Sequence, residues 1–213
     1  MIDQLQAEVT LVAKCRSTVS DDPLFQVLQP IAALLFPVEA ETFDDHHAFM
    51  VQYKPNEDLG LDMHTDDSDV TFNVALGREG FKGAGLTFCG TVGKPDHRQF
   101  NHTYKHRVGH AVLHLGSRRH GADDIISGER NNLIVWNHNN VFRNSRAYHE
   151  ERNNYEPESG KPSKRCLSYT HDRDYGAYKA YPAGTEEFKG KGWCPPHHAC
   201  YDGMERVFAR GEL

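Results

Sequence analysis

The sequence predicts a mainly β protein with flanking helices, an α+β class in which a sandwich or barrel is covered by the N-terminal segment. Two patterns lead to this prediction. From His46 onward, short runs rich in β-branched and aromatic residues are separated by glycines and by Asn- and Asp-rich turns, which is typical of sandwiches and barrels. Before that point, apolar residues recur at helical spacing. The length of 213 residues suits one sizeable domain with a buried core.

A helical segment over about the first 36 residues precedes six expected strands. Leu5, Val9 and Val12 recur on one helix face, and the Asp-Asp-Pro sequence ending at Pro23 can start a second helix, because proline is tolerated in the first turn. The expected strands are Ala48–Tyr53, Val70–Leu76, Leu86–Cys89, Tyr104–Val108, Ala111–Leu115 and Arg130–Asn137.

The chain divides into three parts of one domain. Residues 1–45 are expected to form a helical support, residues 46–140 the β core, and residues 141–213 a polar C-terminal extension or lid. The last division rests on composition, since the stretch after about Val141 is rich in Asn, Glu, Arg and Lys.

Composition and charge limit the class of protein. Hydrophobic residues make up 38% and charged residues 25%, as in soluble globular proteins. The net charge is −6, whereas proteins that bind nucleic acid typically carry an excess of positive charge. No apolar stretch is suited to a signal peptide or a membrane span. Five cysteines, an odd and widely spaced set, argue against a disulfide scaffold. We therefore expect an intracellular, cytoplasmic protein with no membrane or nucleic-acid partner.

The pattern that indicates chemistry is His64-Thr65-Asp66, followed downstream by His120. In an extended chain residues i and i+2 point to the same side, so His64 and Asp66 can present an imidazole and a carboxylate to one point. Two histidines and one carboxylate form the facial triad of Fe(II) oxygenases, which leaves coordination positions open. By itself the His-x-Asp pattern is weak in a chain with 14 histidines, and a solvated turn is the alternative.

Arg130 adds a second element to this pattern. It lies ten residues after His120 and begins a strand on which period-two alternation places it on the same face as Ile134 and Trp136. A guanidinium in a pocket with apolar walls requires an anionic partner, and a carboxylate matches its fork. The alternative is a surface ion pair with Asp123 or Asp124.

Six motifs occur in a recognisable order. They are Phe49 to Tyr53, His64-x-Asp66, Val70 to Leu76, Gly83 to Phe88, His120-Gly121 and Gly128 to Trp136. Together, over about residues 46–138, they resemble the prolyl-4-hydroxylase-like branch of the 2-oxoglutarate/Fe(II) dioxygenases. The sequence around His64 is most similar to the 2-oxoglutarate and iron-dependent oxygenase domain-containing proteins, and it is also similar to the catalytic domain of procollagen lysyl hydroxylases.

This resemblance implies a double-stranded β-helix, or jelly-roll, core with a metal near one open end. It assigns Fe(II) to His64, Asp66 and His120, and the distal carboxylate of 2-oxoglutarate to Arg130. Tyr53 stands where the family often has a tyrosine that also reaches that carboxylate. The remaining candidate pocket residues are Thr71, Asn73 and Trp136, for which structural roles are the alternative.

The activity that the resemblance implies is hydroxylation of a protein side chain, of the prolyl or lysyl type, with release of succinate and CO₂. The expected partners are a protein or peptide substrate and O₂, with ascorbate as a candidate reductant. Two alternatives stay open: a small-molecule hydroxylase of the same superfamily, and a non-catalytic jelly-roll module that binds metal. A zinc hydrolase is disfavoured because it has no use for an inward-facing Arg130.

Other histidines and cysteines compete as metal ligands. His114, six residues before His120, lies in an apolar run and is interpreted as a core histidine. His102, His106 and His110 repeat every four residues, but the residues between them fit a strand and a turn better than a helix. A structural zinc site in the tail is a minor alternative, with Cys194, His197, His198 and Cys200 as ligands and Cys166 as a further candidate.

Overall fold

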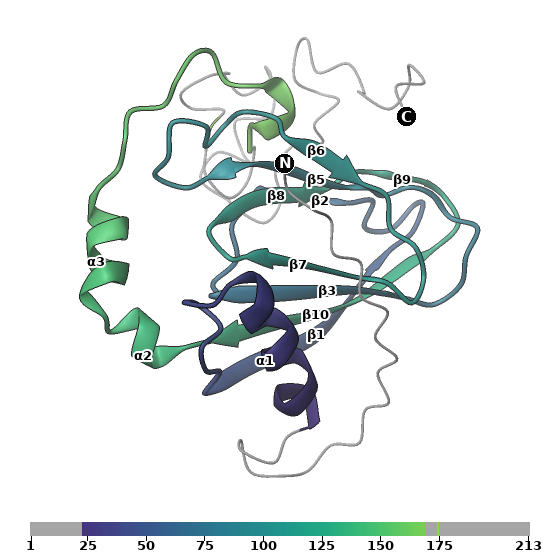
Figure 1. The fold of residues 1–213 in the computed structure, drawn as a ribbon. Helices are drawn as coiled ribbons and strands as arrows, with labels where there is room; N and C mark the ends of the chain where they lie inside the picture. Colours follow the sequence, from purple (N-terminus) through teal and green to yellow (C-terminus); the bar gives the residue numbers. More distant parts are fainter. Residues whose placement is uncertain (1–22, 169–173, 175–213) are drawn as a thin grey trace.

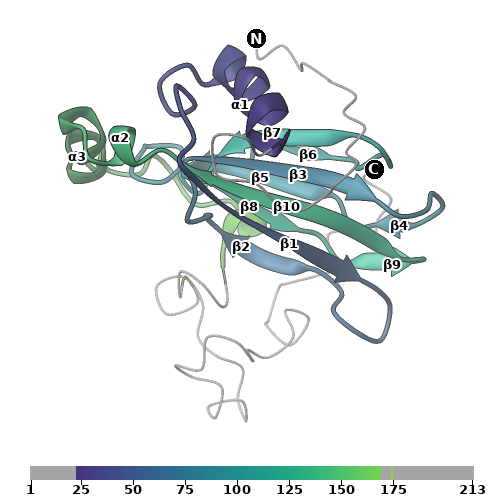
Figure 2. The same cartoon turned by 90° about the horizontal axis from the view of Figure 1, so that it is seen from below.

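Two antiparallel β-sheets face each other, and one helix, α1 (Pro23–Leu35), covers the outer face of one sheet (Figure 1, Figure 2). The computed structural model describes residues 23–168 and residue 174. The strands are β1 (Asp45–Tyr53), β2 (Leu61–His64), β3 (Val70–Leu76), β4 (Lys82–Gly83), β5 (Leu86–Thr91), β6 (His102–Tyr104), β7 (Ala111–Leu115), β8 (Arg118–Ala122), β9 (Ile125–Ser127) and β10 (Arg130–His138). The predicted class, mainly β with flanking helices, is confirmed.

The strand order defines a jelly roll. The major sheet has the order β1-β10-β3-β7 and the minor sheet the order β2-β8-β5-β6, while β4 and β9 form a small separate ribbon. Apart from the β5–β6 hairpin, successive strands of the two large sheets alternate between them, so strands from distant parts of the chain become neighbours. This arrangement is the double-stranded β-helix that the resemblance implied.

The observed strand bounds agree with those predicted from the sequence where the strands are apolar. β3 and β7 have the predicted bounds, and β1, β5 and β10 extend beyond theirs by one to three residues. The strand predicted over Tyr104–Val108 is wrong, because β6 ends at Tyr104 and the chain turns before Gly109, whose φ is +81°. β2 and β8 were not predicted, since their sequences are short and largely polar.

The core lies between α1 and the outer face of the major sheet. The second predicted helix is confirmed as α1, with Pro23 as its first residue, whereas the helix expected around Leu5 falls outside the described residues. Leu28 and Ala32 of α1 pack against Phe72 and its neighbours on β3. Alternate residues of β3 face the opposite way, toward the minor sheet, and two of these, Thr71 and Asn73, are polar. The inner space between the sheets is therefore not filled by apolar side chains alone.

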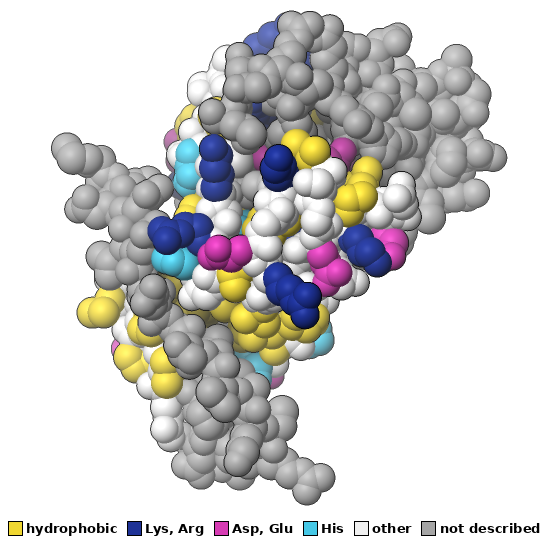
Figure 3. Space-filling model, turned by 90° about the vertical axis from the view of Figure 1, so that its right-hand side faces the viewer, with side chains coloured by type: hydrophobic (Ala, Val, Ile, Leu, Met, Phe, Trp, Pro, Cys, Tyr) yellow, Lys and Arg dark blue, Asp and Glu magenta, His cyan; other side chains and the backbone are white. Residues whose placement is uncertain are grey.

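Charged side chains of both signs are interspersed on the face shown in Figure 3, where Lys and Arg lie beside Asp and Glu. None of the helices within the described residues has the length and apolar character needed to cross a membrane. The expectation that the protein has no nucleic-acid or membrane partner stays a prediction, as does its cytoplasmic location.

The segment after β10 is partly helical rather than irregular. Asn139 caps α2 (Asn140–Arg143) by accepting a hydrogen bond from the backbone N–H of Phe142, and Ser145 caps α3 (Arg146–Asn153) in the same way. The polar composition does match a surface position, because α3 has no buried residue. The division of the chain at residues 45 and 140 stays a prediction.

The chain after α3 returns to the outer face of the minor sheet. A short 3-10 helix, η2 (Lys164–Cys166), brings Cys166 to β5, where it forms a disulfide with Cys89. Close by, the fully buried Arg119 of β8 donates hydrogen bonds to the Cys166 carbonyl and to Asp174, at 2.7 Å each. The cysteine spacing did not indicate this pair, and the bond is more typical of an oxidising compartment than of the expected cytoplasm. It also removes Cys166 from the candidate zinc ligands.

We predict that Cys166→Ala lowers the free energy of unfolding by about 2–4 kcal/mol, because the disulfide closes a long loop of the unfolded chain. Chemical denaturation of the oxidised parent and of the variant measures this. Cys89→Ala and the double variant should lose the same amount, and adding a reductant should destabilise the parent alone. Equal stability of oxidised parent and variant would show that the bond contributes nothing.

Candidate active site

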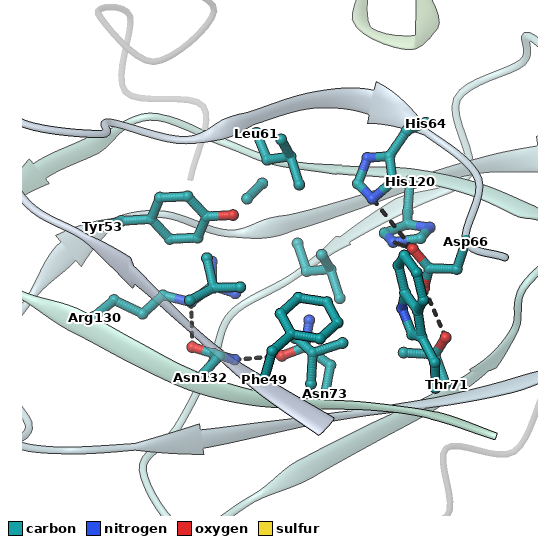
Figure 4. Close-up of a pocket in the computed structure, with 15 residues that line it drawn as sticks. Phe49, Tyr53, Leu61, His64, Asp66, Thr71, Asn73, His120, Arg130 and Asn132 are labelled. Atoms are coloured by element: carbon teal, nitrogen blue, oxygen red, sulfur yellow. Dashed lines mark hydrogen bonds and ion pairs between the residues drawn. The ribbon is translucent and has the colours of Figure 1, made fainter. Parts of the chain in front are cut away.

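A pocket opens between the two sheets (Figure 4). Its lining residues come from β1, β3 and β10 of the major sheet and from β2, β5 and β8 of the minor sheet, with Asp66 added from the loop after β2. They are Phe49, Val51, Tyr53, Leu61, His64, Asp66, Thr71, Asn73, Leu86, His120, Ala122, Arg130, Asn132, Ile134 and Trp136. All eight residues predicted for the site are among them.

His64, Asp66 and His120 converge at one end of this pocket. His64 is the last residue of β2 and pairs in register with His120 of β8. Oδ1 of Asp66 lies 3.3 Å from Nε2 of His64 and 3.5 Å from Nε2 of His120. One ligand atom from each of the three residues lies within 4.8 Å of the others. Asp66 itself follows the strand rather than extending it, and its backbone N–H donates to the Gly116 carbonyl.

The hydrogen bonds of the two histidines prepare them to bind a metal. Nδ1 of His64 donates to the Asp62 carbonyl and Nδ1 of His120 to the Arg118 carbonyl, both at 2.8 Å. A carbonyl oxygen only accepts, so Nδ1 of each ring carries a proton, and in the neutral ring the lone pair is on Nε2, which faces Asp66. Burial lowers the pKa of His120 well below its usual range, although Asp66 opposes this shift. Neutral imidazoles and a carboxylate are the ligands that Fe(II) takes in a facial triad, so the residues present fit that metal.

Thr71 supports the carboxylate of Asp66. Its hydroxyl donates to Oδ2 of Asp66 at 2.6 Å and lies 2.7 Å from the hydroxyl of Ser68. Oδ1 is thereby left to face the two histidines. Thr71 lines the pocket as expected, but its hydroxyl is occupied by the metal-binding carboxylate.

Arg130 lies at the other end of the pocket, beside Tyr53 (Figure 4). Only 1% of its surface is exposed, so the alternative of a surface ion pair is wrong. Its Nε donates to Oδ1 of Asn132 at 2.7 Å and its Nη1 to the Ala84 carbonyl. Burial lowers the pKa of Arg130 to about 10, which still leaves it cationic at neutral pH. Among the described residues, no carboxylate lies within ion-pair distance of this guanidinium.

The residues around Arg130 hold it in place. Asn132 donates in turn to Oδ1 of Asn73, so both amides are occupied by each other and by the guanidinium. Ala84 has a φ of +52°, in the left-handed region that non-glycine residues rarely adopt, and its methyl group is fully buried. This backbone directs the Ala84 carbonyl to Arg130. Its role could not be predicted, because alanine carries no sequence signal for a left-handed position.

Tyr53 and Trp136 form parts of the pocket wall. The Arg130 guanidinium carbon lies 5.2 Å from the centre of the Tyr53 ring. Burial raises the pKa of Tyr53 to about 12, against the opposing effect of Arg130, so its hydroxyl keeps its proton. Trp136 packs edge-on against Phe49, with ring centres 5.2 Å apart, and its buried Nε1–H has no hydrogen-bond partner.

Other candidates from the sequence are not placed together. His102, His106 and His110 form no group with metal-ligand spacing in the part of the chain that the structure describes. The tail cluster of Cys194, His197, His198 and Cys200 lies outside the described residues. His114 is buried, as expected for a core histidine, but its ring lies tilted at 57° to that of His120 with centres 4.3 Å apart.

The chain is similar to curated oxygenase domains over part of its length. It is 39% identical over 130 residues to 2-oxoglutarate and iron-dependent oxygenase domain-containing protein ICU11 of Arabidopsis thaliana, covering 58% of this chain and 32% of that protein. It is 41% identical over 131 residues to 2-oxoglutarate and iron-dependent oxygenase domain-containing protein 2 of Homo sapiens, covering 59% and 37%. The resemblance read from the motifs is therefore confirmed. The chain spans about a third of the length of these relatives.

Two further comparisons complete this picture. No family model matches the chain. Among solved structures, a Pseudomonas putida prolyl-4-hydroxylase aligns with a TM-score of 0.40 and 20% identity, over 53% of this chain and 60% of that one.

We predict that Asp123, near Arg130, makes stability depend on pH. Burial raises the pKa of Asp123 to about 6, and the hydrogen bond from Thr87 only partly offsets this. The folded state thus holds a proton that the unfolded state releases, and stability falls as pH rises from about 4 to about 6. Asp123→Asn keeps an acceptor for Thr87 and removes the charge. It should be more stable than the parent above pH 7, by on the order of 1–3 kcal/mol, with no gain at pH 4.

Thermal denaturation of parent and variant across this pH range measures the difference. The exposed Asp58, for which no comparable burial exists, supplies the control variant Asp58→Asn, which should follow the parent. A difference between Asp123→Asn and the parent that does not change with pH would contradict the assigned pKa.

Proposed function

We propose that this domain is a non-haem Fe(II)- and 2-oxoglutarate-dependent dioxygenase that hydroxylates a protein side chain. One observation carries the proposal: a single pocket has a triad of candidate metal ligands at one end and, at the other, a buried arginine with no carboxylate partner among residues 23–168 and 174. A dicarboxylic 2-oxo acid has the complementary groups, a chelating end for the metal and a distal carboxylate for the arginine. The named relatives support the same class.

His64, Asp66 and His120 would hold the iron, with Thr71 fixing the orientation of the carboxylate. When bound, the metal supplies the oxidative chemistry with O₂ and the 2-oxo acid as co-substrates, yielding succinate and CO₂. Arg130 would bind the distal carboxylate through its guanidinium fork, with the protonated Tyr53 hydroxyl as a second donor.

The walls between the two ends exclude water. Leu86, Ala122 and Ile134 line the pocket, and Leu86 and Ile134 are buried. Removing water from a site strengthens the interaction between the buried guanidinium and a bound carboxylate, because the effective dielectric constant falls. The residues of the jelly roll thus bind and orient the co-substrate, while the metal carries the oxidative chemistry.

The proposal of a protein substrate rests on the surroundings of the pocket. Leu61 lines the pocket and is 37% exposed, and Phe49 and Trp136, which also line it, are half-buried. An accessible apolar rim can contact a chain on both sides of one inserted side chain, whereas a small molecule is usually enclosed in its site. The small-molecule hydroxylase remains the second candidate, and the non-catalytic metal-binding module is the third.

Turnover separates these candidates. Anaerobic protein loaded with Fe(II) and 2-oxoglutarate should show a weak visible charge-transfer band, and admitting O₂ should release succinate. Stimulation of succinate release by prolyl or lysyl peptides supports a protein substrate, while stimulation by metabolites alone would overturn that part of the proposal. Metal binding with neither band nor succinate would leave the non-catalytic module and overturn the enzyme.

We predict that Arg130→Ala weakens the binding of 2-oxoglutarate by about 10²–10³-fold, because a buried carboxylate that loses its partner costs roughly 3–5 kcal/mol. Metal affinity without co-substrate should stay unchanged. Arg130→Lys should recover only part of the loss, since an ammonium keeps the charge but not the fork. Calorimetric titration of the metal-loaded variants measures both affinities.

Two variants serve as comparisons for this experiment. His64→Ala should lose metal binding and, with it, productive 2-oxoglutarate binding. Arg107→Ala removes an exposed arginine outside the pocket and should bind 2-oxoglutarate as the parent does. Unchanged 2-oxoglutarate affinity in Arg130→Ala would place the carboxylate anchor elsewhere.

A further inference from the structure

His114 lies beside two of the metal ligands, Asp66 and His120. It belongs to β7, where it pairs in register with Thr71 of β3, and only 5% of it is exposed. Its ring is 4.3 Å from the ring of His120 and 5.3 Å from that of Phe88, centre to centre. The interpretation as a core histidine with satisfied hydrogen bonds accounts for its burial but not for its Nε2 atom, which has no hydrogen-bond partner.

The hydrogen bond at the other nitrogen of His114 repeats the pattern of the two histidine ligands. Nδ1 of His114 lies 3.0 Å from the Leu115 carbonyl, to which it can only donate. The lone pair of the neutral ring is therefore on Nε2, which lies 3.9 Å from Oδ2 of Asp66. A histidine with Nδ1–H bonded to a backbone carbonyl and Nε2 facing a carboxylate is the arrangement found at metal centres.

Two acceptors face each other here without a donor between them. Oδ2 of Asp66 already accepts from Thr71, whose hydroxyl hydrogen is thereby used. An unpartnered acceptor in a buried site is unfavourable, so the arrangement favours a ligand that supplies an O–H. A water molecule bound to a divalent metal is such a donor, and the metal makes it a stronger one.

The position of His114 argues against direct ligation. The group whose ligand atoms lie within 4.8 Å of one another contains His64, Asp66 and His120, and not His114. A water bound to the metal extends the reach of the centre by about one hydrogen bond, roughly 2.7–3 Å. Such a water can donate to a buried acceptor that no ligand atom contacts, and Nε2 of His114 is an acceptor of this kind.

We propose that His114 is a positioning residue of the metal centre, whose Nε2 accepts a hydrogen bond from a water bound to the metal, beside Oδ2 of Asp66. The inference rests on the metal-binding half of the proposed function. According to this inference, the unpartnered Nε2 atom makes His114 part of the site. Strand β7, which supplies none of the ligands, then also contributes to metal binding. A histidine that only fills space would have no such effect.

The test compares metal affinity with stability in His114→Phe. The ring is retained and the unpartnered nitrogen is removed. The affinity for Mn(II), measured by calorimetry without co-substrate, should fall by about 10–100-fold, as for other residues that support metal ligands. The thermal stability of the metal-free variant should not fall, because an unsatisfied buried acceptor has been replaced by an apolar ring. His114→Gln, which offers a carbonyl acceptor, should recover part of the affinity.

His106→Phe is the matched control. His106 is also buried, with 8% of it exposed, and its Nε2 also lacks a hydrogen-bond partner, but it lies beside Asn132 rather than beside the metal ligands. Its affinity for Mn(II) should equal that of the parent. Equal losses in the two variants would overturn the inference, because the effect would then follow from packing.

The remaining outcomes are also decisive. Equal Mn(II) affinity in the parent and in His114→Phe would overturn the role of His114 while leaving the proposed function intact. A parent that binds no divalent metal would overturn both. Electron paramagnetic resonance of the Cu(II)-loaded protein counts the nitrogen atoms bound to the metal. We expect two such nitrogens in the parent and also two in His114→Phe. Three in the parent and two in the variant would overturn the water-mediated contact and make His114 a ligand.

Discussion

The burial of a positive charge at Arg130 is the constraint on which the inner face of the jelly roll depends. A guanidinium withdrawn from water must be surrounded by acceptors, and here these are the carbonyl of Ala84 and the side chain of Asn132. Each acceptor is itself constrained: Ala84 by a left-handed backbone, and Asn132 by Asn73. The domain therefore retains polar groups where a sandwich of this size would otherwise pack apolar side chains.

Strand register determines where this charge lies relative to the metal ligands. β10 lies between β1 and β3, and Arg130 at its start is paired with Tyr53 at the end of β1. His64 and His120 are paired across β2 and β8 of the opposite sheet. A shift of one residue in either pair would turn a functional side chain to the other face. Antiparallel pairing within the two sheets thus positions the residues that line the pocket. Of these residues, Asp66 alone lies in a loop.

The sequence indicated the site better than it indicated the surroundings of the site. β3 and β7 were predictable because their apolar runs are bounded by turns, and His64, Asp66 and Arg130 because they occur within six motifs in a recognisable order. β8 was not predictable, because its sequence Arg-Arg-His-Gly-Ala is largely polar and is buried by contacts with distant parts of the chain. A local sequence pattern carries no signal for such contacts. The pairing of Cys89 with Cys166 joins positions 77 residues apart, and only the fold brings them together.

β8 links the metal site to the C-terminal segment. His120 faces the pocket, so alternation turns its neighbour Arg119 to the outer face of the minor sheet, where Arg119 contacts Asp174 and the carbonyl of Cys166. His120 and Arg119 share one short strand, and Asp174 supplies a carboxylate to the buried guanidinium of Arg119. The polar C-terminal segment, which the composition suggested as a surface extension, therefore contacts, at Cys166 and Asp174, the strand that carries His120.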